Sequence, residues 1–182
     1  VRHRDRKKNL SRAARKQARD IELAILKTTT GDAGVGRDNF AKFTDWPEEL
    51  WSKSNKLRLC MAGTRDGFSQ AVAALDAKPP VRGKEIEVRS VSRPDDAASC
   101  HILVIAGREG MTQWARGAAN GHVLTVGDGE GFAPSGGIIG LFVEGEKVRF
   151  EINQDAASRA GLKLSSQLLK LARLVKDGQG GK

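Results

Sequence analysis

The chain has 182 residues, a length that suits one domain with its own hydrophobic core. The hydrophobic fraction of 39% is typical of a globular protein, and no apolar run approaches the roughly 18 residues of a transmembrane helix. The net charge of +9 is concentrated in residues 1–37, which contain eleven Lys and Arg against four Asp and Glu. Residues 38–182 contain twenty and eighteen, so the body lacks the basic excess that would indicate nucleic-acid binding.

Three segments are predicted from this distribution. Residues 1–37 are expected to form a basic extension, mainly solvated, with a basic helix over residues 11–27 that ends in a glycine-containing stretch. This extension contains no secretory signal, because no apolar segment of roughly 7–15 residues follows its basic start. The leading Val, with no Met, suggests a trimmed or differently started chain. Residues 38–177 are expected to form the folded domain, and residues 178–182 a flexible tail.

The ordered part is predicted to begin with a helix, because Phe40, Phe43 and Trp46 recur at a spacing of three residues and Pro47 would end that helix. Strands and helices are then expected to alternate along the chain. The apolar patterns predict strands at 56–63, 84–92, 101–107 and 122–128, helices at 67–75 and 111–119, and a short turn or helix at 93–100.

The C-terminal third is predicted to contain a hairpin that turns at residues 144–147. On its second strand Val148, Phe150 and Ile152 would face the core, whereas Arg149, Glu151 and Asn153 would form the polar face. A helix over 165–175 would follow, capped by serine, with an apolar stripe of Leu168, Leu171, Ala172 and Val175.

This order predicts a single α/β domain with a mostly parallel central sheet of the flavodoxin or Rossmann type and flanking helices. The C-terminal hairpin would add antiparallel strands at one edge of that sheet.

Residues 127–142 contain six glycines, and a phosphate-binding loop is one interpretation of this stretch. A P-loop needs a following Lys and a hydroxyl, and no Lys is present there. A dinucleotide fingerprint belongs after the first strand and opens a helix, whereas this stretch comes late and opens a strand. Asp128 and Glu130 would also repel phosphate. The glycines are therefore predicted to form tight turns and close backbone contacts.

The loop at 63–68 lies after the first predicted strand, where parallel sheets usually bind ligands. Arg65 could meet an anion there, although a solvated arginine paired with Asp66 is the favoured interpretation. The alternative function that follows from this loop is a small-ligand- or nucleotide-binding flavodoxin-like enzyme using residues 63–67. Otherwise no catalytic set, metal site or cofactor is predicted. Adjacent Cys100 and His101 would point to opposite faces of a strand, and no nucleophile elbow is present.

Cys60 and Cys100 are the two cysteines, and the sequence leaves two interpretations of them open. If their strands are neighbours, as in a flavodoxin-like order, the Cα atoms could approach within the roughly 4.4–6.8 Å that a disulfide needs. Two buried thiols that behave as small apolar side chains are the equally weighted alternative.

Several segments together resemble the YfiR family. They are NFAKFTDWP, LRLCMAG, GKEIEVRSV, CHILVIA, the block LTVGDGEGFAPSGGIIGLFVEGEKVRFEIN and GLKLSSQLLKLARLV, which occur in order over about residues 38–175. The resemblance implies a small periplasmic α/β protein without enzymatic activity. Such proteins restrain an inner-membrane diguanylate cyclase, or in other members a sensor kinase, by binding its periplasmic region.

The resemblance also implies specific residue roles. Cys60 and Cys100 match one cysteine pair of the family, whose disulfide state tunes the restraint. A second pair is absent here, because Phe132 and Gly140 stand in its places. Phe132, Ile138, Ile139 and Glu151 are the candidates for the partner surface or its support. For Phe132 plain packing is the alternative, and for Glu151 simple solvation.

One departure from the family concerns the residues before NFAKF, where members carry a signal peptide and an apolar helix and this chain has TTTGDAGVGRD. A periplasmic location is thus implied by the resemblance and not by the N-terminus. A membrane signalling protein is the expected partner, self-association into a homodimer is left open, and nucleic acid is not expected as a partner.

Overall fold

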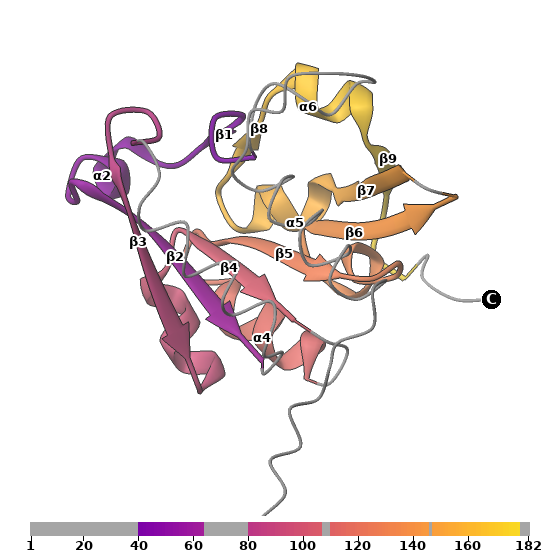
Figure 1. The fold of residues 1–182 in the computed structure, drawn as a ribbon, viewed down its shortest axis with the longest axis horizontal. Helices are drawn as coiled ribbons and strands as arrows, with labels where there is room; N and C mark the ends of the chain where they lie inside the picture. The colour runs from indigo at the N-terminus through magenta and orange to yellow at the C-terminus, as the bar shows by residue number, and fades with distance from the viewer. Residues whose placement is uncertain (1–39, 64–79, 107–109, 146, 179–182) are drawn as a thin grey trace, which may run out of the picture.

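A computed structural model describes residues 40–63, 80–106, 110–145 and 147–178. The helices predicted at 11–27 and 67–75 lie outside these ranges. The described part is an α/β domain built on a seven-stranded sheet, with a separate two-stranded sheet beside it (Figure 1).

The central sheet has the strand order β3-β2-β4-β5-β6-β7-β9. Its first five strands are parallel, which confirms the predicted mostly parallel sheet, and their order is that of a flavodoxin. The strands are β2 (Lys56–Ala62), β3 (Glu85–Val91), β4 (Ile102–Ile105), β5 (Leu124–Asp128), β6 (Ile139–Glu144), β7 (Lys147–Asn153) and β9 (Arg173–Val175).

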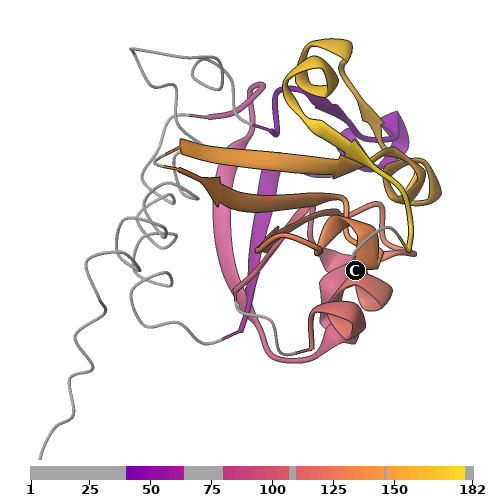
Figure 2. The same cartoon turned by 90° about the vertical axis from the view of Figure 1, so that its right-hand side faces the viewer.

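The sheet is buried on both faces, which explains the continuous apolar runs of its central strands. Alternate side chains of β2 enter different clusters: Leu57 and Leu59 belong to the larger one, whereas Cys60 and Ala62 belong to the smaller. The smaller cluster is completed by the 3₁₀ helix η2 (Pro94–Ser99) and helix α4 (Met111–Ala118). In Figure 2 these two elements pack together below the strands.

The larger cluster lies on the opposite face and is closed by both ends of the domain. Strand β1 (Thr44–Asp45) pairs antiparallel with β8 (Lys163–Leu164), so the indigo and yellow parts of the ribbon meet in Figure 1. Helices α5 (Gln154–Arg159) and α6 (Ser166–Leu171) contribute small and apolar side chains to the same cluster. The N-terminal and C-terminal parts of the domain therefore share one core.

The helix predicted to end at Pro47 is wrong, because turns and strand β1 occupy residues 40–45 and the helix instead follows the proline. Helix α2 (Glu48–Trp51) begins where the Pro47 carbonyl accepts hydrogen bonds from the amides of Leu50 and Trp51. Proline suits a helix start because it lacks the N–H that would be unpaired there. Phe40 and Trp46 are nevertheless buried, so the aromatic pattern correctly indicated core residues although these residues do not form a helix.

The helix predicted over 165–175 is also too long. Ser165 does cap it, since its Oγ accepts from the amide of Leu168 at 3.3 Å, but the helix ends at Leu171 and Ala172 is extended. Residues 173–175 then form β9, which pairs parallel with β7. The hairpin β6–β7 is consequently internal to the sheet, and β9 forms the edge that the hairpin was expected to form.

No helix of the described ranges has both the length and the apolar character that crossing a bilayer would require.

Candidate functional site

Cys60 and Cys100 are joined by a disulfide, with their Cα atoms 5.9 Å apart. Cys60 lies in β2 and Cys100 lies two residues before the start of β4, the strand beside β2. The amide of His101 donates to the carbonyl of Arg58 at 2.9 Å and aligns the start of β4 with β2. The flavodoxin strand order therefore produces the neighbourhood on which the disulfide interpretation depended.

The disulfide is buried in the smaller cluster together with Phe132. Cys60 is 0% exposed, Cys100 is 3% exposed and Phe132 is 2% exposed. All three belong to one buried cluster, which also contains Leu103.

Phe132 lies in a slot made by two glycines of the stretch 127–142. A Cβ on Gly127 or on Gly137 would overlap the Phe132 ring, so these positions admit no side chain while the ring stays in place. Phe132 directly precedes the 3₁₀ helix η3 (Ala133–Ser135), which ends at Gly136 with φ +103°. The glycines therefore allow tight turns and close contacts, as the sequence predicted. We call residues 127–140, which surround the Phe132 ring, the glycine loop.

Glu151 on β7 also stabilises this loop. Its Oε1 accepts the amide of Gly131 at 2.9 Å, and its Oε2 lies 2.8 Å from Nη2 of Arg173. A Cβ on Gly140 would come within 2.8 Å of Glu151 Oε1, so this glycine makes room for the carboxylate. Arg173 also bonds Glu130 at 2.6 Å and lies over the Phe142 ring at 4.3 Å.

The expectation that Glu151 faces solvent is wrong, since its side chain is 1% exposed. Asn153, predicted on the same polar face, is also fully buried. The reason is that η3 and the glycine loop cover this end of β7, so only Arg149 of the predicted polar face remains exposed. Hydrogen bonds from Gly131 and Arg173 make the burial of the carboxylate tolerable.

Asn153 connects the glycine loop to the C-terminal part of the domain. Its Oδ1 accepts the amide of Ala156 and thereby caps α5, while its Nδ2 donates to the carbonyl of Ala133 and to Asp177 Oδ1. The hydrogen bonds to Asn153 and Arg159 lower the pKa of Asp177, with that of Arg159 contributing most.

His101 follows Cys100 and is buried against two tryptophans. Its Nδ1 accepts the amide of Arg58 at 2.9 Å, and its ring meets Trp46 and Trp51 edge-on with centroids 6.2 and 6.1 Å away. Burial lowers the pKa of His101 to about 4, and the charges of Arg58 and Lys84 add to this effect. The ring is therefore neutral at pH 7 and serves as a hydrogen-bond acceptor.

The ligand crevice predicted at the carboxyl end of β2 is described only at its base. The backbone of Gly63, with φ +92°, lies so close to the Ala106 carbonyl that a Cβ at this position would overlap it. The amide of Ala106 donates to the carbonyl of Ala62 at 2.9 Å. Arg65 and the other residues from 64 to 67 lie outside the described residues, so the predicted anion contact stays a prediction.

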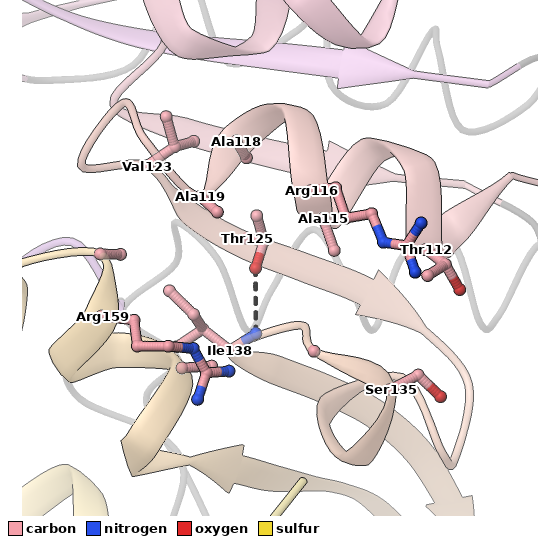
Figure 3. A pocket seen from close by; sticks show the side chains of 13 residues that line it. Thr112, Ala115, Arg116, Ala118, Ala119, Val123, Thr125, Ser135, Ile138 and Arg159 are labelled. Atoms are coloured by element: carbon pink, nitrogen blue, oxygen red, sulfur yellow. Dashed lines mark hydrogen bonds between the residues drawn. The ribbon is translucent and has the colours of Figure 1, made fainter. Parts of the chain in front are cut away.

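A pocket of about 230 Å³ opens between α4, β5, η3 and α5 (Figure 3). Alanines from α4, from α5 and from the residue after each helix contribute to its wall, and Arg116 and Arg159 are among the residues that line it. The sequence contained no signal for this pocket, because the residues that form it are small, common and distant along the chain.

The four residues predicted for the partner surface are all buried, with exposed fractions of 2% or less. Phe132 and Glu151 both contact the glycine loop: the Phe132 ring lies against Gly127 and Gly137, and Glu151 accepts the amide of Gly131. Ile138 and Ile139 belong to the larger cluster, and the amide of Ile138 donates to Thr125 Oγ1 at 2.9 Å. Sequence reasoning missed Arg173 and Asn153, because their partners lie 20 or more residues away in the chain.

Comparison with protein families gives one match over most of this structure. The model of the YfiR/HmsC-like family matches residues 38–173, a range that contains the central strands, the disulfide, the glycine loop and Arg173.

Proposed function

Because the chain belongs to the YfiR/HmsC-like family, we propose that it binds the periplasmic sensor region of an inner-membrane diguanylate cyclase or sensor kinase and lowers that protein's output. The family match over residues 38–173 carries this proposal. The family is regulatory and periplasmic, and the same role and location are proposed for this chain, which would act by binding and not by catalysis.

Control by the Cys60–Cys100 disulfide is a second part of the proposal. The bond ties β2 to the start of β4 and lies in the same buried cluster as Phe132. Reduction would remove this tie and loosen the packing around the Phe132 ring, and through it the glycine loop. The oxidised form would hold the loop in its binding conformation, so a change in envelope redox state would alter restraint of the partner.

The predicted partner residues act in this proposal as supports. Phe132, Ile138, Ile139 and Glu151 are buried, so a partner would contact the backbone and exposed neighbours of the glycine loop that these side chains hold. Substituting Phe132 would then weaken binding through the loop conformation. Self-association into a homodimer is a further part of the proposal, which sedimentation of the purified chain measures directly.

The test uses the full chain together with the membrane signalling protein encoded beside it. Expression of the chain in the periplasm is expected to lower cellular cyclic di-GMP several-fold when the partner is a cyclase, or autophosphorylation when it is a kinase. The purified sensor region is expected to be retained by the immobilised chain. Unchanged output together with no retention by the folded chain would contradict the proposal.

Redox control has its own arm in the same experiment. The double variant Cys60→Ala/Cys100→Ala is expected to restrain the partner less well and to be insensitive to reductant. If it restrains the partner as the parent chain does, binding stands and redox control is refuted.

A further inference from the structure

The pocket between α4 and α5 has an apolar interior. Ala115 and Ala118 of α4, Ala156 of α5 and Ala160, which follows α5, line it, and all four are buried. Thr125 is the buried one of the three hydroxyl side chains that line the pocket, and its hydroxyl already accepts the Ile138 amide, as the dashed line in Figure 3 shows. With this polar group satisfied, an entering group gains chiefly by removing apolar surface from water.

Two arginines give the mouth of the pocket a positive charge. Figure 3 shows Arg116 of α4 and Arg159 of α5 on opposite sides of the Thr125–Ile138 hydrogen bond. Arg159 pairs with Asp177 at 2.7 Å, whereas Arg116 is exposed and forms no ion pair within the described part of the chain. Among the described residues, those that line the pocket include no carboxylate. A guanidinium without a partner favours a carboxylate, which it can bind through two parallel hydrogen bonds.

The size of the pocket indicates what kind of occupant fits. Its volume of about 230 Å³ is below the roughly 300–1,000 Å³ of typical small-molecule sites. It suits a single large apolar side chain, and interfaces commonly depend on a few such anchors that fill pockets on the other protein. The apolar interior fits the anchor side chain of the partner. The positive charge at the mouth favours an acidic residue next to that side chain.

We propose that this pocket receives one large apolar side chain from the sensor region of the membrane partner, with an adjacent Asp or Glu of that region paired to Arg116. This inference rests on the proposed function, because it names the contact by which the partner is held. It places that contact on α4 and α5, on side chains different from the buried supports of the glycine loop.

A site-specific cross-link tests the position of the contact. Ala119 is exposed and lines the pocket, whereas Gln113 is exposed on the same helix outside it. Each is replaced in turn by the photoreactive amino acid p-benzoylphenylalanine in the full chain, which is then irradiated with the purified sensor region. Position 119 is expected to cross-link and position 113 is not. Mass spectrometry is expected to place the link at an apolar residue next to Asp or Glu.

Charge reversal tests the chemistry of the mouth. Arg116→Glu is expected to raise the Kd for the sensor region at least about tenfold, because attraction of the acidic neighbour becomes repulsion. Arg149→Glu is the matched control, since Arg149 is exposed on β7 and does not line the pocket. Its Kd is expected to change less than about threefold. Circular dichroism and urea unfolding verify that both variants are folded.

The outcomes separate the two proposals. If the unaltered chain does not bind the sensor region, the proposed function and the pocket inference both fail. If the complex forms but position 119 gives no link and Arg116→Glu binds normally, the pocket inference alone is overturned. A link to a second copy of the chain, or to residues 1–39 of the same chain, also overturns it and identifies the actual occupant.

Discussion

The Glu151 carboxylate lies 2.8 Å from the guanidinium of Arg173, across the pairing of β7 with β9. Glu151 is 1% exposed, whereas the Arg173 side chain is 45% exposed, so the pair joins a buried anion to a cation at the surface. Through Oε1 the same carboxylate holds the amide of Gly131. One buried acid thus connects the edge strand β9 to the glycine loop.

Arg173→Ala is expected to destabilise the fold by about 3 kcal/mol, because it leaves the Glu151 carboxylate buried without its cation. Urea unfolding measures the change in the free energy of unfolding. Glu130→Gln is the control: it removes the other carboxylate that Arg173 bonds, and that side chain is 61% exposed. Its cost is expected to stay below about 1 kcal/mol. Equal costs for the two variants would show that the burial of Glu151 has no energetic consequence.

His101 is expected to make the fold sensitive to acid. Its pKa is lowered from 6.5 to about 4 by burial, so between these values the unfolded chain binds a proton that the folded chain does not. The contribution to stability is therefore present above pH 6.5 and is lost as pH falls toward 4, by about 2–3 kcal/mol.

The measurement compares the parent chain with His101→Asn in urea at pH 7 and at pH 4.5. The Asn oxygen retains an acceptor for the Arg58 amide but does not titrate, so carboxylates shared by both proteins cancel in the difference. The variant is expected to lose less stability than the parent over this interval. Parallel losses would mean that the His101 pKa is close to its ordinary value in the folded state.

The disulfide is expected to contribute roughly 3–4 kcal/mol, because it closes a loop with a sequence separation of 40 residues. Unfolding of the parent chain with and without reductant gives this value on one sequence. The double variant Cys60→Ala/Cys100→Ala should unfold at the same midpoint in both conditions, near that of the reduced parent. A parent chain that does not respond to complete reduction would refute the expected contribution.

Gly137→Ala is expected to destabilise the fold by about 2 kcal/mol, since its Cβ would overlap the Phe132 ring and the core would be overpacked. Phe132→Ala alone should cost about 3 kcal/mol through the cavity that it leaves. The double variant should be destabilised by less than the sum of the two single variants, because the clash is gone once the ring is removed. Strict additivity would show that the ring does not occupy the slot between Gly127 and Gly137.

The sequence by itself determined the sheet. The apolar runs at β2, β4 and β5 predicted strands of a mostly parallel sheet, and the observed order is the flavodoxin one of the two types, flavodoxin and Rossmann, that the sequence left open. The glycine stretch was correctly interpreted as structural, because the residues that phosphate chemistry needs are absent from it. Both features can be predicted from the sequence because strand burial and turn geometry depend on residues that are adjacent in the chain.

Tertiary structure decided whatever depended on distant segments. Residues 173–175 continue a helical pattern, yet they form β9 because β7 offers backbone partners and Glu151 offers a partner for Arg173. Glu151 and Asn153 alternate like solvent-facing residues, yet η3 and the glycine loop cover them. The arginine-rimmed pocket exists only because α4 and α5 come together. A local pattern records which face a residue occupies on its own element, whereas what covers that face is set by chain far away in sequence.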